Sequence, residues 1–124
     1  MTGTTKIRQD FLNAAITQDV ELIRTVAADS IISIEVINPA KHRGVNIDYI
    51  ATRGNEEQYG TMKIRFKNAS NYTLQEVDVY GDDCGVSFSL IASGTNYSVV
   101  VAADDSNGTN VEIQFKINYI NKLN

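Results

Sequence analysis

The chain has 124 residues, which is long enough for one domain built around a single hydrophobic core. It carries 11 Lys and Arg against 15 Asp and Glu, a net charge of -4, and the basic residues are scattered along the sequence. Nucleic-acid binding depends on a concentrated positive surface, so nucleic acid is not an expected partner. No apolar run approaches the roughly 20 residues that cross a bilayer, so we expect no membrane partner and assembly in a cytoplasm.

Residues 1–18 differ from the rest because their apolar side chains follow an approximate helical spacing instead of alternating. These side chains are Ile7, Phe11, Leu12 and Ile16. A helix of about two turns is marginal on its own, so the segment must lie on its own domain or on a partner. We predict a short N-terminal arm or helix that is a candidate docking segment, followed by a β-sandwich domain over residues 19–124.

From Asp19 onward, apolar and polar residues alternate with a period of two. The clearest case is Val111–Tyr119, where every odd-numbered residue is apolar and is expected to face a core. Short runs bounded by turn residues predict an all-β, antiparallel sandwich or jelly roll of about eight strands. The expected strands are 20–26, 31–37, 45–53, 60–68, 72–80, 85–92, 96–103 and 111–120.

Two local irregularities are also expected. The segment 53–60 is predicted to be a hairpin loop that contains Tyr59, and Asn107-Gly108 suits a tight turn with positive φ angles. In the fifth strand the inward parity changes between Leu74 and Val77, which predicts a β-bulge between them.

Enzymatic chemistry has no visible residue set. The single histidine, His42, lies between Lys41 and Arg43 and is expected to be exposed in a loop, without the partners that nucleophilic catalysis requires. The single cysteine, Cys84, follows two aspartates that would raise its pKa, so we expect a packing role. We therefore predict no catalytic residue and no enzyme.

The acidic segment Asp104–Gly108 has a composition faintly like a calcium loop. It lacks the distant bidentate Glu and the alternating carboxylates of such loops, so solvated turn residues are the simpler interpretation. We expect no metal site and no cofactor.

Aromatic side chains raise the alternative of a glycan receptor, because sugar faces stack on exposed rings. Tyr97 and Tyr119 have the parity of core residues. Tyr59, in the expected loop, is the candidate for contact with a partner.

Four blocks carry a resemblance to one group of proteins. Their order and spacing resemble those of the small β-sandwich domains of tailed-bacteriophage virion proteins, found in tail fibres and other surface appendages. The blocks are Val45–Gly54, Gly60–Phe66, Gly85–Leu90 and Gly108–Tyr119. The group's Ser-Gly-Gly before the penultimate strand is Ser93-Gly94-Thr95 here, and its final Arg-Arg pair is absent.

The resemblance implies a non-enzymatic structural protein of the virion, assembled in the host cytoplasm. It would be a decoration, cement or fibre-like component of the capsid or tail, in contact with other virion proteins. By analogy it implies a homo-oligomer, with a trimer as the expected form. Two alternatives stay open, a receptor- or glycan-binding knob at a tail tip and an unrelated bacterial β-sandwich adaptor.

Overall fold

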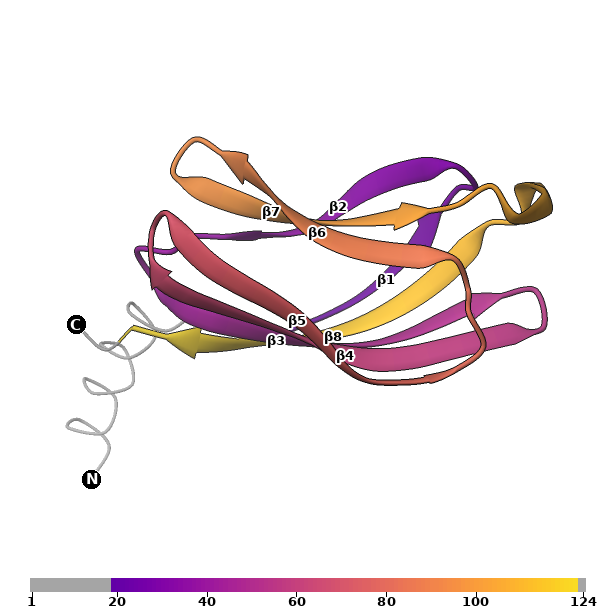
Figure 1. The fold of residues 1–124 in the computed structure, drawn as a ribbon, viewed down its shortest axis with the longest axis horizontal. Coiled ribbons are helices and arrows are strands. Elements are labelled where there is room, and N and C mark those ends of the chain that lie inside the picture. Colours follow the sequence, from indigo (N-terminus) through magenta and orange to yellow (C-terminus); the bar gives the residue numbers. More distant parts are fainter. Residues whose placement is uncertain (1–18, 123–124) are drawn as a thin grey trace, which may run out of the picture.

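A computed structural model describes residues 19–122, which form a two-layer antiparallel β-sandwich (Figure 1). The predicted docking residues Ile7, Phe11, Leu12 and Ile16 lie outside the described part of the chain. The elements are β1 (Val20–Val26), β2 (Ser30–Ile37), β3 (His42–Arg53), β4 (Glu56–Asn68), β5 (Asn71–Gly81), β6 (Val86–Ser93), β7 (Asn96–Ala103), a 3-10 turn (Ser106–Gly108) and β8 (Val111–Asn121).

The larger sheet has the strand order β1-β8-β3-β4-β5, and the smaller sheet has the order β2-β7-β6. All neighbouring strands are antiparallel. The chain crosses between the sheets after β1, after β2, after β5 and after β7, so that β8 returns to lie between β1 and β3. The predicted all-β fold class is therefore confirmed. Among the described residues, no helix is long and apolar enough to span a membrane.

The core lies between the two sheets and follows the predicted alternation. In β8, Val111, Ile113, Phe115 and Ile117 are buried, while the polar residues between them are exposed. β4 contributes its even-numbered residues in the same way, whereas in β7 Val99, Val100 and Val101 are all buried. Removal of these apolar side chains from water is the main favourable term for folding. The inward facing predicted for β8 is confirmed.

The turn after β3 is shorter than predicted, because only Gly54 and Asn55 connect β3 to β4. Gly54 has a φ of 62°, which permits a two-residue hairpin turn. Gly60 lies inside β4, where a Cβ would stand 3.2 Å from the Tyr49 hydroxyl and 3.1 Å from Val79. Glycine therefore allows the side chains of Tyr49 and Val79 to approach the backbone of β4 closely. Tyr59 precedes Gly60 in the same strand, so the prediction that Tyr59 lies in a loop is wrong.

The predicted bulge in the fifth strand exists, but it lies further along β5. Glu76 pairs with the buried Met62, so the inward parity that includes Leu74 continues to Glu76. The register shift follows Val77, where Asp78 has a φ of 53°. The glutamate can face inward at this edge strand because its carboxylate accepts a hydrogen bond from the Tyr49 hydroxyl at 3.4 Å.

One buried arginine fastens the end of the sandwich where β3 meets the β7–β8 connection. Arg53 is 3% exposed, and its Nε donates to the carbonyl of Thr109 at 2.8 Å. Nη1 donates to the carbonyl of Cys84 at 2.9 Å and forms an ion pair with Asp104 Oδ1 at 2.6 Å. Nη2 donates to the Asp104 carbonyl at 2.7 Å. This guanidinium therefore holds the β5–β6 and β7–β8 connections to the end of β3 through its planar fork.

Candidate functional site

The outer face of the larger sheet carries a row of apolar side chains that crosses all five strands. Cross-strand pairing aligns its members side by side. This apolar row consists of Ile23 of β1, Gln114 of β8, Ile50 of β3, Tyr59 of β4 and Tyr80 of β5. Four of the five are large apolar side chains that remain 44–60% exposed. Gln114 separates Ile23 from the run Ile50, Tyr59 and Tyr80, and a run of exposed apolar side chains of this kind is typical of an interaction surface.

Tyr59 and Tyr80 end the apolar row as an aromatic pair. Their ring centroids are 5.8 Å apart, and the rings are tilted by 35°. The bulge at Asp78 makes this pairing, because it changes the parity of β5 and so turns Tyr80 to the outer face. Without that extra residue, Tyr80 would have the same facing as Glu76.

A charged row lies directly beside the apolar row. It aligns Glu21, Lys116, Asp48 and Thr61 across β1, β8, β3 and β4. Thr61 Oγ1 donates to Asp48 Oδ1 at 2.6 Å, which orients that carboxylate. The charged row offers two carboxylates and one ammonium group next to apolar surface.

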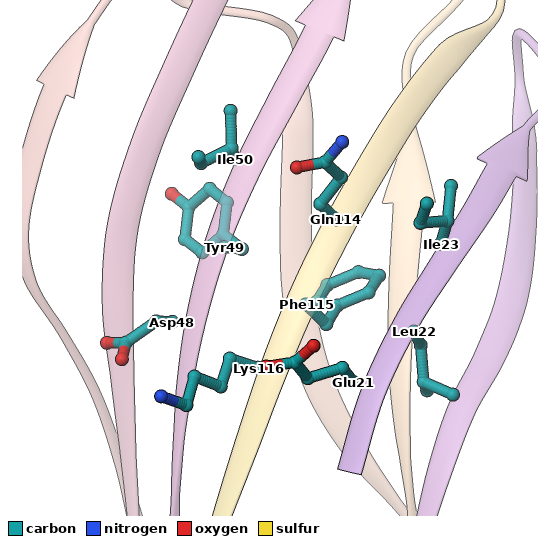
Figure 2. Close-up of a pocket in the computed structure, with 9 residues that line it drawn as sticks. All are labelled: Glu21, Leu22, Ile23, Asp48, Tyr49, Ile50, Gln114, Phe115 and Lys116. Atoms are coloured by element: carbon teal, nitrogen blue, oxygen red, sulfur yellow. The ribbon is translucent and has the colours of Figure 1, made fainter.

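The two rows line a groove of about 690 Å³ over β1, β8 and β3. Figure 2 shows Glu21, Asp48 and Lys116 at one end and Ile23, Ile50 and Gln114 at the other. Leu22, Tyr49 and Phe115 complete its lining from the strands themselves. The groove therefore combines an apolar end with a polar end that can give and accept hydrogen bonds, which is the composition of a binding site.

Tyr59 is thus placed where a partner could reach it, although on a strand instead of a loop. Sequence reasoning missed Ile23, Ile50 and Tyr80. The available signal was that Ile23 and Ile50 are apolar at outward positions, beside the inward Leu22 and Tyr49. Tyr80 gave no such signal, because its facing depends on the position of the bulge.

The expectation that His42 is an exposed loop residue is wrong. It is the first residue of β3, is 4% exposed, and packs its ring on that of Tyr119 with centroids 4.6 Å apart. Its Nδ1 accepts a hydrogen bond from the backbone N–H of Asn38 at 3.3 Å. The flanking charges of Lys41 and Arg43 suggested exposure, but strand alternation turns the residue between them inward.

We predict that His42 makes the folded state less stable at acidic pH. Burial lowers the pKa of His42 below its usual 6.5, and the nearby Lys41 ammonium group lowers it further. The Glu35 carboxylate acts in the opposite direction but is the smallest of the three effects. Between the two pKa values the unfolded chain therefore binds a proton that the folded chain does not, so stability falls as the pH drops below about 6.5. Each tenfold change in proton affinity corresponds to about 1.4 kcal/mol.

Urea unfolding at pH 7 and at pH 5 measures this dependence. The free energy of unfolding should decrease more on acidification in the wild type than in His42→Gln, which has no titrating group at this position. Equal decreases in the two proteins would contradict the prediction.

Cys84 is buried, as its predicted packing role requires. Burial is the largest cause that raises the pKa of its thiol, and the carboxylates of Glu56 and Asp82 raise it further. Its backbone N–H donates to Oε1 of the buried Gln58 at 2.8 Å, and Gln58 Nε2 donates to the Tyr49 hydroxyl at 3.0 Å. Cys84 therefore anchors the β5–β6 connection to the core.

The acidic segment after β7 has a structural contact of its own. The Asp104 carboxylate pairs with Arg53, and Asn107 and Gly108 have the positive φ angles of 59° and 74° that their sequence predicts. Within residues 19–122, no three His, Cys, Asp or Glu side chains gather in a way that could hold a metal ion.

No protein-family model matches the chain, and no curated protein matches it. Among solved structures it is similar to the tailspike protein of Acinetobacter phage vB_ApiP_P1, with a TM-score of 0.48 and 12% identity over 84% of this chain and 23% of that one. The tailspike protein of Acinetobacter baumannii phage AM24 gives a TM-score of 0.44 and 5% identity over 86% of this chain and 27% of that one.

A third structure is the tailspike protein gp49 of Acinetobacter baumannii bacteriophage Fri1, described as a capsular polysaccharide depolymerase. Its TM-score is 0.35 at 16% identity, over 92% of this chain and 23% of that one. The chain thus spans only about a quarter of the length of each of these tailspike proteins.

Proposed function

We propose that the chain is a non-enzymatic structural component of a bacteriophage particle, a β-sandwich module that contacts other virion proteins on the capsid or tail surface. Two independent features support this assignment. The first is the ordered set of sequence blocks that resembles small virion β-sandwich domains. The second, which carries the proposal, is the apolar row on the outer face of the larger sheet.

The geometry of the apolar row suits contact with a protein surface. It follows the hydrogen-bonding direction across five strands, so it presents a strip of apolar side chains, interrupted only by Gln114, on a five-stranded sheet. Interfaces are enriched in aromatic side chains and are bordered by polar groups. The apolar row contains the Tyr59–Tyr80 pair at one end, and the charged row borders it over β1, β8, β3 and β4.

Variants of the apolar row test the proposal. We expect Ile50→Ser/Tyr59→Ser to fold with a melting temperature close to that of the wild type, because both side chains are 44% exposed. Incorporation into particles should fall by about tenfold, the effect of losing a contact of about 1.4 kcal/mol. Copy number per purified particle, measured by quantitative mass spectrometry, gives the result.

Ile120→Ser is the matched control. Ile120 is 39% exposed on the same outer face but outside the groove and the apolar row. The Ile120→Ser protein should be incorporated into particles at the wild-type copy number. Equal incorporation of Ile50→Ser/Tyr59→Ser and wild type would overturn the proposed contact surface.

A receptor- or glycan-binding knob is the second candidate, and one observation favours it. Tyr59 and Tyr80 expose adjacent ring surfaces, and Tyr59 pairs with Ile50, which lines a groove that also offers the Asp48 carboxylate and the Gln114 amide. Binding of the isolated protein to host polysaccharide, lost in Tyr59→Ala and kept in Ile120→Ser, would favour this candidate over the structural role.

A further inference from the structure

The four edge strands of the two sheets are protected to different degrees. β1 carries Glu21 and Arg24, β5 is bulged at Asp78, and β2 has a register shift before Glu35. β6 has none of these features. Its sequence, Val86–Ser93, contains no charged residue and no proline, and it pairs with β7 without a register shift over eight residues. Charges, prolines and bulges are the usual means of preventing edge-to-edge pairing, so β6 is open to another strand.

The free edge of β6 offers unpaired backbone groups. The β6–β7 hairpin has a two-residue loop, so its closing pair, Ser93 and Asn96, is hydrogen-bonded, and such pairs alternate along the ladder. Even-numbered residues of β6 therefore direct their N–H and C=O groups away from β7. Within residues 19–122, no strand other than β7 pairs with β6.

The outer face of the smaller sheet is uncharged as well. Eleven side chains share this face, none is charged, and all but Asn96 at the hairpin end are aliphatic or serine. They are Ile31, Ser33 and Val36 of β2, Asn96, Ser98, Val100 and Ala102 of β7, and Ser87, Ser89, Ile91 and Ser93 of β6. Ile31, Val36 and Ile91 are 49–64% exposed. An uncharged face beside an uncharged edge is notable in a chain with 26 charged residues, 11 basic and 15 acidic.

We propose that β6 pairs with β6 of a second copy of this chain, antiparallel and about a two-fold axis at Ser89. The two small sheets then form one continuous sheet with the order β2-β7-β6-β6-β7-β2. This inference does not depend on the role proposed above. A two-fold pairing gives a dimer, in contrast to the trimer expected by analogy from the sequence.

The self-complementarity of β6 selects a second copy as the partner. In the register centred on Ser89, Phe88 lies opposite Leu90 of the other copy, and Val86 lies opposite Ala92. These are the residues whose backbone groups point to the free edge, and all four have apolar, inward-facing side chains. The pairing therefore extends the core side of the sheet, as an isologous interface requires.

Electrostatics favour this edge over the other three. The chain has a net charge of -4, so two copies repel each other on average. Pairing through β6 places no charged side chain opposite another. β1, β2 and β5 would instead bring charged side chains into the contact between copies, Glu21 and Arg24, Glu35, or Glu76 and Asp78, and charged edge residues discourage such pairing.

Cysteine cross-linking of the full chain tests both the edge and the register. At the two-fold axis the Cβ atoms of the two residues 89 lie about 4.5–5.5 Å apart, close to disulfide distance. Ser89→Cys should therefore become a covalent dimer of twice the 13.7 kDa chain mass under mild oxidation. The native Cys84 is buried and should not compete.

Ser87→Cys and Ser33→Cys are matched controls. Both are exposed serines on the same face, but the proposed register places Ser87 opposite Ile91, and Ser33 lies in β2 on the far edge. Neither should cross-link. Cross-linking of Ser87→Cys in place of Ser89→Cys, or equally in all three, would overturn the proposal.

The molar mass of the uncross-linked protein gives an independent result. Light scattering should find a dimer for the wild type and for Ser33→Lys. Ser89→Lys places two ammonium groups opposite each other at the axis and should weaken the dimer by about fivefold. A wild-type protein that is monomeric or trimeric at all concentrations would contradict the two-fold pairing.

Discussion

Phe115→Asp is expected to leave the chain unfolded or aggregated at room temperature. Phe115 is 3% exposed in the central part of β8 and meets the ring of Phe88 edge to face, with centroids 6.3 Å apart. The substitution removes an aromatic ring from the core and buries a carboxylate without a partner. Together these effects cost at least about 4–5 kcal/mol, comparable to the whole stability of a small domain.

Circular dichroism and a thermal melt measure this outcome, and Gln114→Asp provides the control. Gln114 is the neighbouring residue of the same strand but faces water, so its replacement should change the melting temperature by only a few degrees. A Phe115→Asp protein that melts like the wild type would mean that the facing of β8 is inverted.

Arg53→Met is expected to destabilise the protein by about 3–5 kcal/mol while leaving its overall volume nearly unchanged. The guanidinium donates to the carbonyls of Cys84, Thr109 and Asp104 and to the Asp104 carboxylate. Methionine satisfies none of these acceptors, and those that stay away from water lose their hydrogen bonds without compensation.

Urea unfolding gives the difference in free energy directly. Arg43→Met is the matched control, because Arg43 is exposed on the same strand and should cost less than about 0.5 kcal/mol. Arg53→Lys should lie close to Arg53→Met, since an ammonium group cannot reproduce the planar fork. If Arg53→Met lowers the free energy of unfolding by less than about 1 kcal/mol, the hydrogen bonds of the Arg53 guanidinium contribute little to stability.

The candidate site could be predicted only in part. The sequence identified Tyr59 as a candidate for contact with a partner. Its neighbours in the apolar row could not be identified in the same way, because they come from strands far apart in the sequence. Cross-strand alignment depends on register, and register depends on turn length and bulges. The two-residue turn at Gly54 and the bulge at Asp78 together bring Tyr59 and Tyr80 into one pair.

Local patterning by itself determined that this chain is an antiparallel β protein, roughly where most of its strands lie, and which face of β8 enters the core. Those features follow from a two-residue period that most of the strands repeat, so no distant contact is needed to infer them. Tertiary structure alone decided the burial of His42, the hydrogen bonds of the Arg53 guanidinium, the position of the β5 bulge and the apolar row. Each of these depends on which strands become neighbours, because hydrogen bonds and close packing between distant segments leave no periodic trace in the sequence.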